Sequence, residues 1–215
     1  MKFWSLAMVV GSAAYCISQG ADARSLSARS APFSDRQMVI YGTAEAPIGY
    51  TKFCGENPDE CRHRAQNDAE VILTGAKMKE LQTINQDVNL AVKPMSDQAQ
   101  YNTIEKWTYP NSGKGDCEDY VLLKMRRLME RGWPQSVLLI TVVRDEHGEG
   151  HAVLTVRTGR GDLVLDNKNS RVLAWTETPY QFIKRQSSVD PQRWNSLIPM
   201  REVPTVAASA AERHD

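Results

Sequence analysis

One stretch of the chain restricts the possible folds more than any other: a helical pattern that begins at Asp116 and is followed directly by three strand-like runs. Gly132 and Pro134 end the helix, and the runs SVLLITVVR, HAVLTVRT and DLVLDNKN come next, joined by short turns. A helix followed by hairpins, without alternating strands and helices, predicts an α+β fold with an antiparallel sheet. One face of the helix carries the apolar residues Tyr120, Val121, Met125, Leu128 and Met129.

The start of this helix holds a cysteine among acidic residues. Asp116 takes the N-cap position, which places Cys117 in the first turn. The partial positive charge and free N–H groups of a helix N-terminus favour a thiolate there. Negative charge on Asp116, Glu118 and Asp119 opposes it. Either the thiol is inert, or another group offsets the carboxylates.

The first residues, MKFWSLAMVVGSAAYCISQGADA, combine Lys2, an apolar run and a small-residue ending at Ala23. This pattern predicts a secretory signal over residues 1–23 and hence a periplasmic or secreted protein. A membrane anchor is the alternative, but the run is shorter than the ~20 residues that a spanning helix needs. We therefore expect no membrane span after signal removal.

Loss of the signal removes Cys16 and leaves three cysteines. In an oxidising compartment the close pair Cys54 and Cys61, in CGENPDEC, is predicted to form a disulfide worth about 2.5 kcal/mol. Two unrelated thiols or half of a zinc site are the alternatives. Zinc fits less well, because the gap is wider than usual ligand spacing and His63 is the only nearby imidazole. Cys117 is then the single free thiol.

Composition suits one globular domain. The chain has 215 residues, 41% of them hydrophobic, with a formal net charge of zero, which gives no support for nucleic-acid binding. Residues 41–200 are expected to form the domain, with a flexible lead-in at 24–40 and a flexible tail at 201–215. Within it, residues 62–92 have mostly helical spacing and fit one or two helices, and residues 101–115 are turn-rich.

Among the four histidines, His151 is the candidate base, because it opens an apolar strand. His63, His147 and His214 lie in polar segments, where a solvated surface role is expected.

The hairpin after His151 supplies an orienting carboxylate. A two-residue turn would pair Thr158 with Gly161 and set His151 opposite Lys168. Asp166 is then a diagonal neighbour on the same face, roughly 7 to 8 Å away, within reach of the imidazole. A one-residue slip would separate the two side chains, and an edge histidine beside a turn-side aspartate is the alternative.

Cys117, His151 and Asp166 form a set suited to acyl transfer. The histidine takes the thiol proton, the aspartate holds the imidazole tautomer, and the thiolate attacks a carbonyl carbon. N–H groups at the helix start, including that of Cys117, are placed to stabilise the oxyanion.

At these residues the sequence resembles the bacterial transglutaminase-like cysteine peptidases, the LapG-type periplasmic family. GDCEDYVLLK, HAVLTV and LVLDN carry the resemblance, and FCGENPDEC and NQDVNLAV are similar to the N-terminal half of that family. The resemblance spans about residues 50–175 and leaves residues 176–200 without a matched motif. It implies a papain-like transglutaminase core, with the catalytic cysteine on a helix N-terminus packed against the antiparallel sheet. Cys117, His151 and Asp166 match the family triad.

The resemblance also implies a cofactor and partners. It points to a calcium-dependent endopeptidase that cleaves a protein substrate, with a large surface adhesin of a biofilm as the candidate. An inner-membrane receptor that senses cyclic-di-GMP is the implied regulator. The family's metal-binding acidic residues map onto Asp116 and Glu118, with Asp119 or carbonyls of the preceding SGKG loop as further ligands. Without metal, such residues still stabilise a helix start by about 1 kcal/mol.

Two other functions remain open. A transglutaminase or amidase would use the same acyl-enzyme but resolve it with an amine or act on a side-chain amide. The second alternative function is a catalytically idle calcium-binding or partner-binding module. The intact set of Cys117, His151 and Asp166 argues against this alternative.

Overall fold

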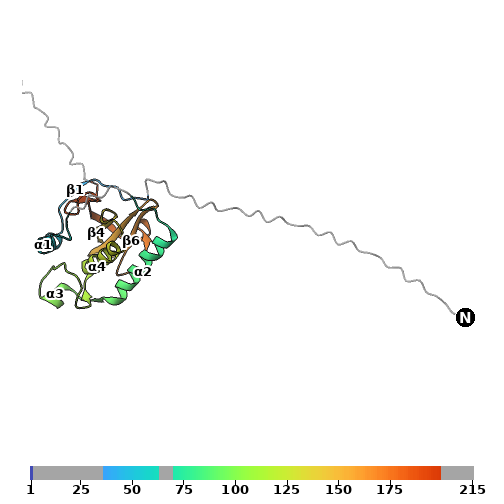
Figure 1. Ribbon diagram of the computed structural model, residues 1–215, viewed down its shortest axis with the longest axis horizontal. Coiled ribbons are helices and arrows are strands. Elements are labelled where there is room, and N and C mark those ends of the chain that lie inside the picture. The colour runs from blue at the N-terminus through green and yellow to red at the C-terminus, as the bar shows by residue number, and fades with distance from the viewer. Residues whose placement is uncertain (2–35, 63–69, 200–215) are drawn as a thin grey trace, which may run out of the picture. The chain divides into compact units, whose positions relative to one another are not determined.

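The computed structural model describes Met1, residues 36–62 and residues 70–199 (Figure 1). Nearly all of the expected signal peptide at 1–23, most of the lead-in at 24–40 and the tail at 201–215 lie outside these residues. Within the described ranges, no helix combines the length and apolarity that crossing a bilayer requires.

Helix α4, Cys117–Glu130, lies in front of the sheet near the middle of the fold (Figure 1). It begins after the N-cap Asp116, as predicted. Gly132, with a φ of 83°, follows its end, and the N–H of Gly132 donates to the carbonyl of Met129 at 2.9 Å. The predicted apolar face is buried, with Leu128 fully inaccessible to solvent.

Seven of the described strands form one sheet in the order β1-β9-β8-β4-β5-β6-β7, with every neighbouring pair antiparallel. The other two, Lys93–Pro94 and Lys114–Gly115, pair in parallel as a separate sheet. The prediction of an α+β fold with an antiparallel sheet is therefore confirmed. The predicted meander is its β4-β5-β6 part. The strands of the seven-stranded sheet are β1 Gly42–Ala44, β4 Leu138–Arg144, β5 Gly150–Thr158, β6 Gly161–Leu165, β7 Leu173–Ala174, β8 Gln181–Gln186 and β9 Trp194–Ser196.

Strand β5 separates two hydrophobic clusters. Its pairing with β6 joins Thr158 to Gly161, the register expected from the sequence. Alternate residues Ala152, Leu154 and Val156 belong to the large inner cluster, which includes the buried face of α4. The smaller outer cluster consists of Met38, Val143, Val153, Val164, Phe182 and Leu197, with Trp175 and Tyr180 packed against it.

The region before α4 is more varied than predicted. Residues 62–92 hold one described helix, which begins only at Gly75, because Thr74 caps it by accepting from the N–H of Lys77 at 3.2 Å. Val71 lies before the helix, in a parallel bridge with Thr158. The elements before α4 are α1 Ile48–Glu56, α2 Gly75–Ala91, β2 Lys93–Pro94, α3 Asp97–Tyr101 and β3 Lys114–Gly115. Two short 3-10 helices, η2 Gln135–Val137 and η3 Trp175–Glu177, come after α4.

Cys54 and Cys61 are joined by a disulfide across the end of α1, with Cα atoms 5.5 Å apart, and Cys117 is free. Cys61 is buried in the inner cluster, as are Tyr50 and Phe53 of α1 itself. The disulfide therefore ties this helix to the core.

Residues 176–200, which matched no motif in the sequence, supply strands β8 and β9. These strands lie between β1 and β4, so the sheet continues well beyond the hairpins that local patterning predicts. Their pairing joins residues far apart in the chain, such as Gly42 with Ser196.

Helix α4 also buries a charged side chain. Lys124 has no accessible surface, and its Nζ atom has no hydrogen-bond partner among the described residues. Burial lowers the pKa of Lys124 to about 7, although the charge of Asp166 acts in the opposite direction. The buried ammonium therefore opposes folding at neutral and acidic pH.

Replacing Lys124 with Met should raise the free energy of unfolding by about 1–4 kcal/mol below pH 7, because Met fills a similar volume without charge. The gain should shrink towards pH 10.5: folded Lys124 loses its proton near pH 7, whereas the unfolded chain keeps it, so the wild type gains stability across that window. Urea unfolding at several pH values measures this. Lys79→Met, at an exposed site of α2, is the control. An equal difference at every pH would contradict the interpretation.

Candidate active site

Cys117 lies in the first turn of α4, half-buried against the inner cluster. Its thiol donates a hydrogen bond to Oε2 of Glu118 at 3.2 Å. Burial, followed by the charge and hydrogen bond of Glu118, raises the pKa of Cys117 well above its usual value. A hydrogen bond from the backbone N–H of Ala152 acts in the opposite direction. The sulfur is therefore a protonated thiol in this arrangement.

His151 and Asp166 form a buried hydrogen-bonded pair. Nε2 of His151 lies 2.9 Å from Oδ1 of Asp166, and the two side chains are 2% and 4% exposed. His151 is in β5, and Asp166 directly follows β6. Burial would raise the pKa of Asp166, but hydrogen bonds from His151 and Tyr180 outweigh it, so this pKa is lowered and the carboxylate is charged.

The pair and the thiol meet at the start of β5. Ala152, whose N–H is directed at the sulfur of Cys117, is the residue after His151. In the described part of the chain the thiol donates to Glu118 and not to the imidazole. Because Nε2 of His151 is engaged by Asp166, Nδ1 is the ring nitrogen left for another partner.

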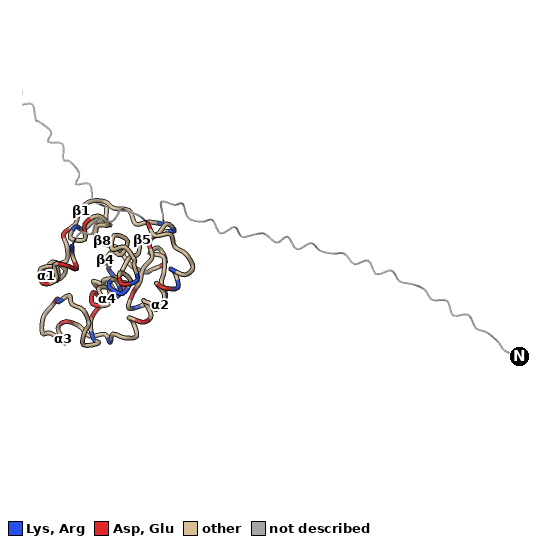
Figure 2. Tube along the Cα trace, in the orientation of Figure 1, with Lys and Arg blue, Asp and Glu red and all other residues tan. Residues whose placement is uncertain are grey.

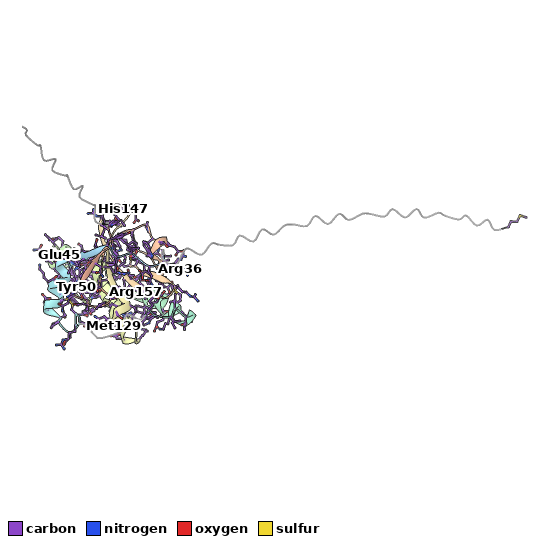
Figure 3. All side chains as sticks on the ribbon, turned by 90° about the horizontal axis from the view of Figure 1, so that it is seen from above. Arg36, Glu45, Tyr50, Met129, His147 and Arg157 are labelled. Atoms are coloured by element: carbon purple, nitrogen blue, oxygen red, sulfur yellow. A yellow bond between two sulfur atoms is a disulfide. The ribbon has the colours of Figure 1, made fainter. Side chains whose placement is uncertain are left out.

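His147 lies apart from these residues. It is exposed in the turn between β4 and β5, at the upper edge of the molecule in Figure 3, and its backbone N–H donates to Asp145. Lys168 closes the same turn through an ion pair of 2.7 Å with Asp145. The geometry therefore favours His151 over His147 as a base.

Three carboxylates gather at the start of α4. Oxygen atoms of Asp97, Asp116 and Glu118 lie within 4.8 Å of one another, and Figure 2 marks acidic positions on α3 and beside α4. Asp116 and Glu118 are the predicted metal ligands, whereas Asp97 was not predicted, because its position matches that of an ordinary first-turn residue after the N-cap Ser96. The cluster joins segments 19 residues apart.

Asp116 stands at the N-cap position of α4, but its side chain does not cap the helix. Its side chain makes no capping hydrogen bond: Oδ2 accepts from the N–H of Asp97 at 3.3 Å, and Oδ1 is buried without a partner among the described residues. Burial and the charge of Asp116 raise the pKa of Glu118 to about 9. Burial, opposed by a hydrogen bond from Lys106, also raises the pKa of Asp97. A divalent cation would relieve this repulsion.

Asp119 has a different role in the same turn. It is fully buried, and its Oδ1 accepts from the backbone N–H of Thr108 at 2.9 Å. Burial raises its pKa to about 7, with the Thr108 hydrogen bond acting in the opposite direction. Asp119 thus fixes the loop before the helix and lies outside the three-carboxylate cluster.

This fold, with a free thiol at a helix start packed against an antiparallel sheet, is the one expected for a transglutaminase-like core. Residues 40–202 match the family model described as bacterial transglutaminase-like cysteine proteinase, BTLCP. The chain belongs to this family, and the family suspected from the sequence is confirmed. No curated protein sequence matches the chain.

Solved structures of LapG from Legionella pneumophila are similar to the chain. The EGTA-treated form shares 24% identity at a TM-score of 0.45, covering 50% of this chain and 61% of that one. The calcium-bound form shares 20% identity at a TM-score of 0.48, covering 60% and 74%. A third LapG structure shares 24% identity at a TM-score of 0.43, covering 50% and 63%.

Gly115 leaves room for Asp119. A methyl group on Gly115 would lie 2.5 Å from Oδ2 and 2.7 Å from Cβ of Asp119. Gly115→Ala should therefore displace Asp119 from Thr108 and lower the free energy of unfolding by about 1–3 kcal/mol. Chemical denaturation measures the loss. Gly55→Ala, where the added methyl meets open space, is the control, and equal stability of the two variants would refute the steric argument.

Proposed function

We propose that this chain is a periplasmic, calcium-dependent cysteine endopeptidase that uses Cys117, His151 and Asp166. The observation that carries the proposal is the buried 2.9 Å hydrogen bond between His151 and Asp166, formed beside the helix start that presents the free thiol. A nucleophile, a base and a group that orients the base are the three elements of this chemistry.

Asp166 sets the tautomer of the base. Its charged carboxylate accepts from Nε2 of His151, so the neutral imidazole carries its proton there and keeps the lone pair of Nδ1. Nδ1 then takes the proton of Cys117 when the thiol turns from Glu118 towards the imidazole. The resulting imidazolium is stabilised by the adjacent Asp166.

The thiolate sulfur attacks the carbonyl carbon of the scissile peptide bond and forms a tetrahedral intermediate. Backbone N–H groups in the first turn of α4 stabilise its oxyanion. The imidazolium returns the proton to the leaving amine, the C–N bond breaks, and a thioester to Cys117 remains. Water, deprotonated by His151, then releases the acid product and the free thiol.

Calcium fits the cluster of Asp97, Asp116 and Glu118. The ion prefers carboxylate and carbonyl oxygens, and the partnerless Oδ1 of Asp116 is a ready ligand. When bound, calcium would supply positive charge that offsets the carboxylates and would draw Glu118 away from the thiol. Proton transfer, attack on the carbonyl carbon and hydrolysis are all carried out by residues of the chain itself.

The resemblance of the motifs supports a protein substrate in the same compartment, with a large surface adhesin as our proposed target. It also supports control by an inner-membrane receptor that senses cyclic-di-GMP. Both partners follow from the family likeness and from the expected signal peptide.

Cys117→Ala and His151→Ala should each abolish cleavage, because they remove the nucleophile and the base. Asp166→Asn should leave a trace of activity, reduced by about 10⁴-fold in kcat, since the base persists in the wrong tautomer. Comparing secreted and surface proteins of cells with wild-type and Cys117→Ala enzyme identifies the thiol-dependent fragments. A labelled amine in the purified reaction separates hydrolysis from amine transfer.

His147→Ala is the matched control, because this histidine is exposed in a turn. Near-normal turnover by His151→Ala, together with loss in His147→Ala, would reassign the base.

Chelation with EGTA should stop cleavage, and added Ca²⁺ should restore it with a dissociation constant of roughly 10⁻⁴ to 10⁻³ M. Asp97→Asn, Asp116→Asn and Glu118→Gln should each weaken calcium binding in titration calorimetry while the fold persists. Asp87→Asn, an exposed carboxylate on α2, should change nothing. Full activity in EGTA would remove calcium from the mechanism.

A further inference from the structure

Tyr180 contacts both members of the His151–Asp166 pair. Its hydroxyl donates to Oδ2 of Asp166 at 2.5 Å, and its ring meets the imidazole edge to face, with centroids 5.5 Å apart and planes at 67°. It lies within residues 176–200, for which the sequence supplied no motif.

The hydroxyl of Tyr180 completes the set of donors around the carboxylate. Oδ1 of Asp166 accepts from Nε2 of His151 at 2.9 Å and from the backbone N–H of Lys168 at 3.0 Å. Without Tyr180, the hydrogen bonds from His151 and from the backbone N–H of Lys168 would act on Oδ1 alone, and the carboxylate could turn about its Cβ–Cγ bond. A donor on Oδ2 fixes the plane of the carboxylate, and hence the direction in which Oδ1 faces the imidazole.

The backbone holds Tyr180 in place independently of the site. Strand β8 begins at the next residue, Gln181, which pairs with Arg144 of β4. The ring packs against the outer cluster, which includes Val143 and Phe182. Tyr180 therefore reaches the carboxylate from a rigid strand end, so its hydroxyl has a fixed position.

We propose that Tyr180 is a positioning residue of the active site, which locks the Asp166 carboxylate and covers one side of the His151 ring. This inference rests on the proposed role of Cys117, His151 and Asp166. Tyr180 acts through Asp166 and takes no part in bond making.

The protonation state of Tyr180 suits this role. Burial, together with its hydrogen bond to Asp166 and the charge of that residue, raises the pKa of Tyr180 above its usual value. The phenol therefore stays a donor wherever Asp166 is ionised.

Alkylation of Cys117 by iodoacetamide at pH 7 in CaCl₂ tests the proposal without a known substrate, because the rate reports how well His151 activates the thiol. Tyr180→Phe keeps the ring and removes one hydrogen bond to a charged group, so the rate should fall about tenfold. The same variant in an Asp166→Ala background should change the rate by less than about twofold, since its partner is gone.

Tyr50→Phe is the matched control: it removes another buried tyrosine hydroxyl, which donates to the carbonyl of Pro191, and should lower stability while keeping the alkylation rate. Equal rate losses from Tyr180→Phe in both backgrounds, or a wild-type rate in Tyr180→Phe, would overturn the positioning role. Proton NMR adds a direct readout, because the Nε2–H signal of His151 should exchange faster in Tyr180→Phe.

The triad itself is tested separately by His151→Ala. An unchanged alkylation rate in that variant would contradict the proposed function. If alkylation is lost in His151→Ala but proceeds at the wild-type rate in Tyr180→Phe, only the proposed role of Tyr180 is contradicted.

Discussion

The packing of α4 against β5 is the contact on which the rest of the site depends. Val121 and Leu128 of the helix and Leu154 and Val156 of the strand share one buried cluster, and each such side chain contributes about 1.5–3 kcal/mol when removed from water. The small side chain of Ala152 stands where the helix start meets the strand. The same core that stabilises the domain therefore sets the thiol beside the strand that carries the base.

This packing creates an electrostatic conflict at the helix start. Burial brings the carboxylates of Asp97, Asp116 and Glu118 together beside the thiol of Cys117, and the positive end of one helix, equivalent to about half a charge, cannot balance them. Burial, followed by the charge of neighbouring carboxylates, raises the pKa values of Cys117 and Glu118. Under the proposed function, a cation bound at this cluster would offset the carboxylates, which makes the charge pattern a point of control.

Sequence reasoning succeeded where structure is local. The bounds of α4 and the two-residue turn follow from short-range rules, and the turn fixes a register that brings His151 to Asp166. It failed where distant segments meet. Asp97 and Tyr180 have no local signature, because their neighbours come from other parts of the chain. Within residues 62–92, Val71 lies in an extended segment before α2, because an apolar residue at this spacing suits a bridge as well as a helix.

The proposed nucleophile and base are held by different packing units. Cys117 packs with the inner cluster, whereas Tyr180, which touches His151 and Asp166, packs against the outer cluster on the opposite face of the sheet. Strand β5 belongs to both, and its first residues are where they meet. Because the two clusters lie on opposite faces of one strand, a change in the packing of either face can shift the thiol or the imidazole. The distance between the thiol and the imidazole therefore depends chiefly on how rigidly the first residues of β5 are held.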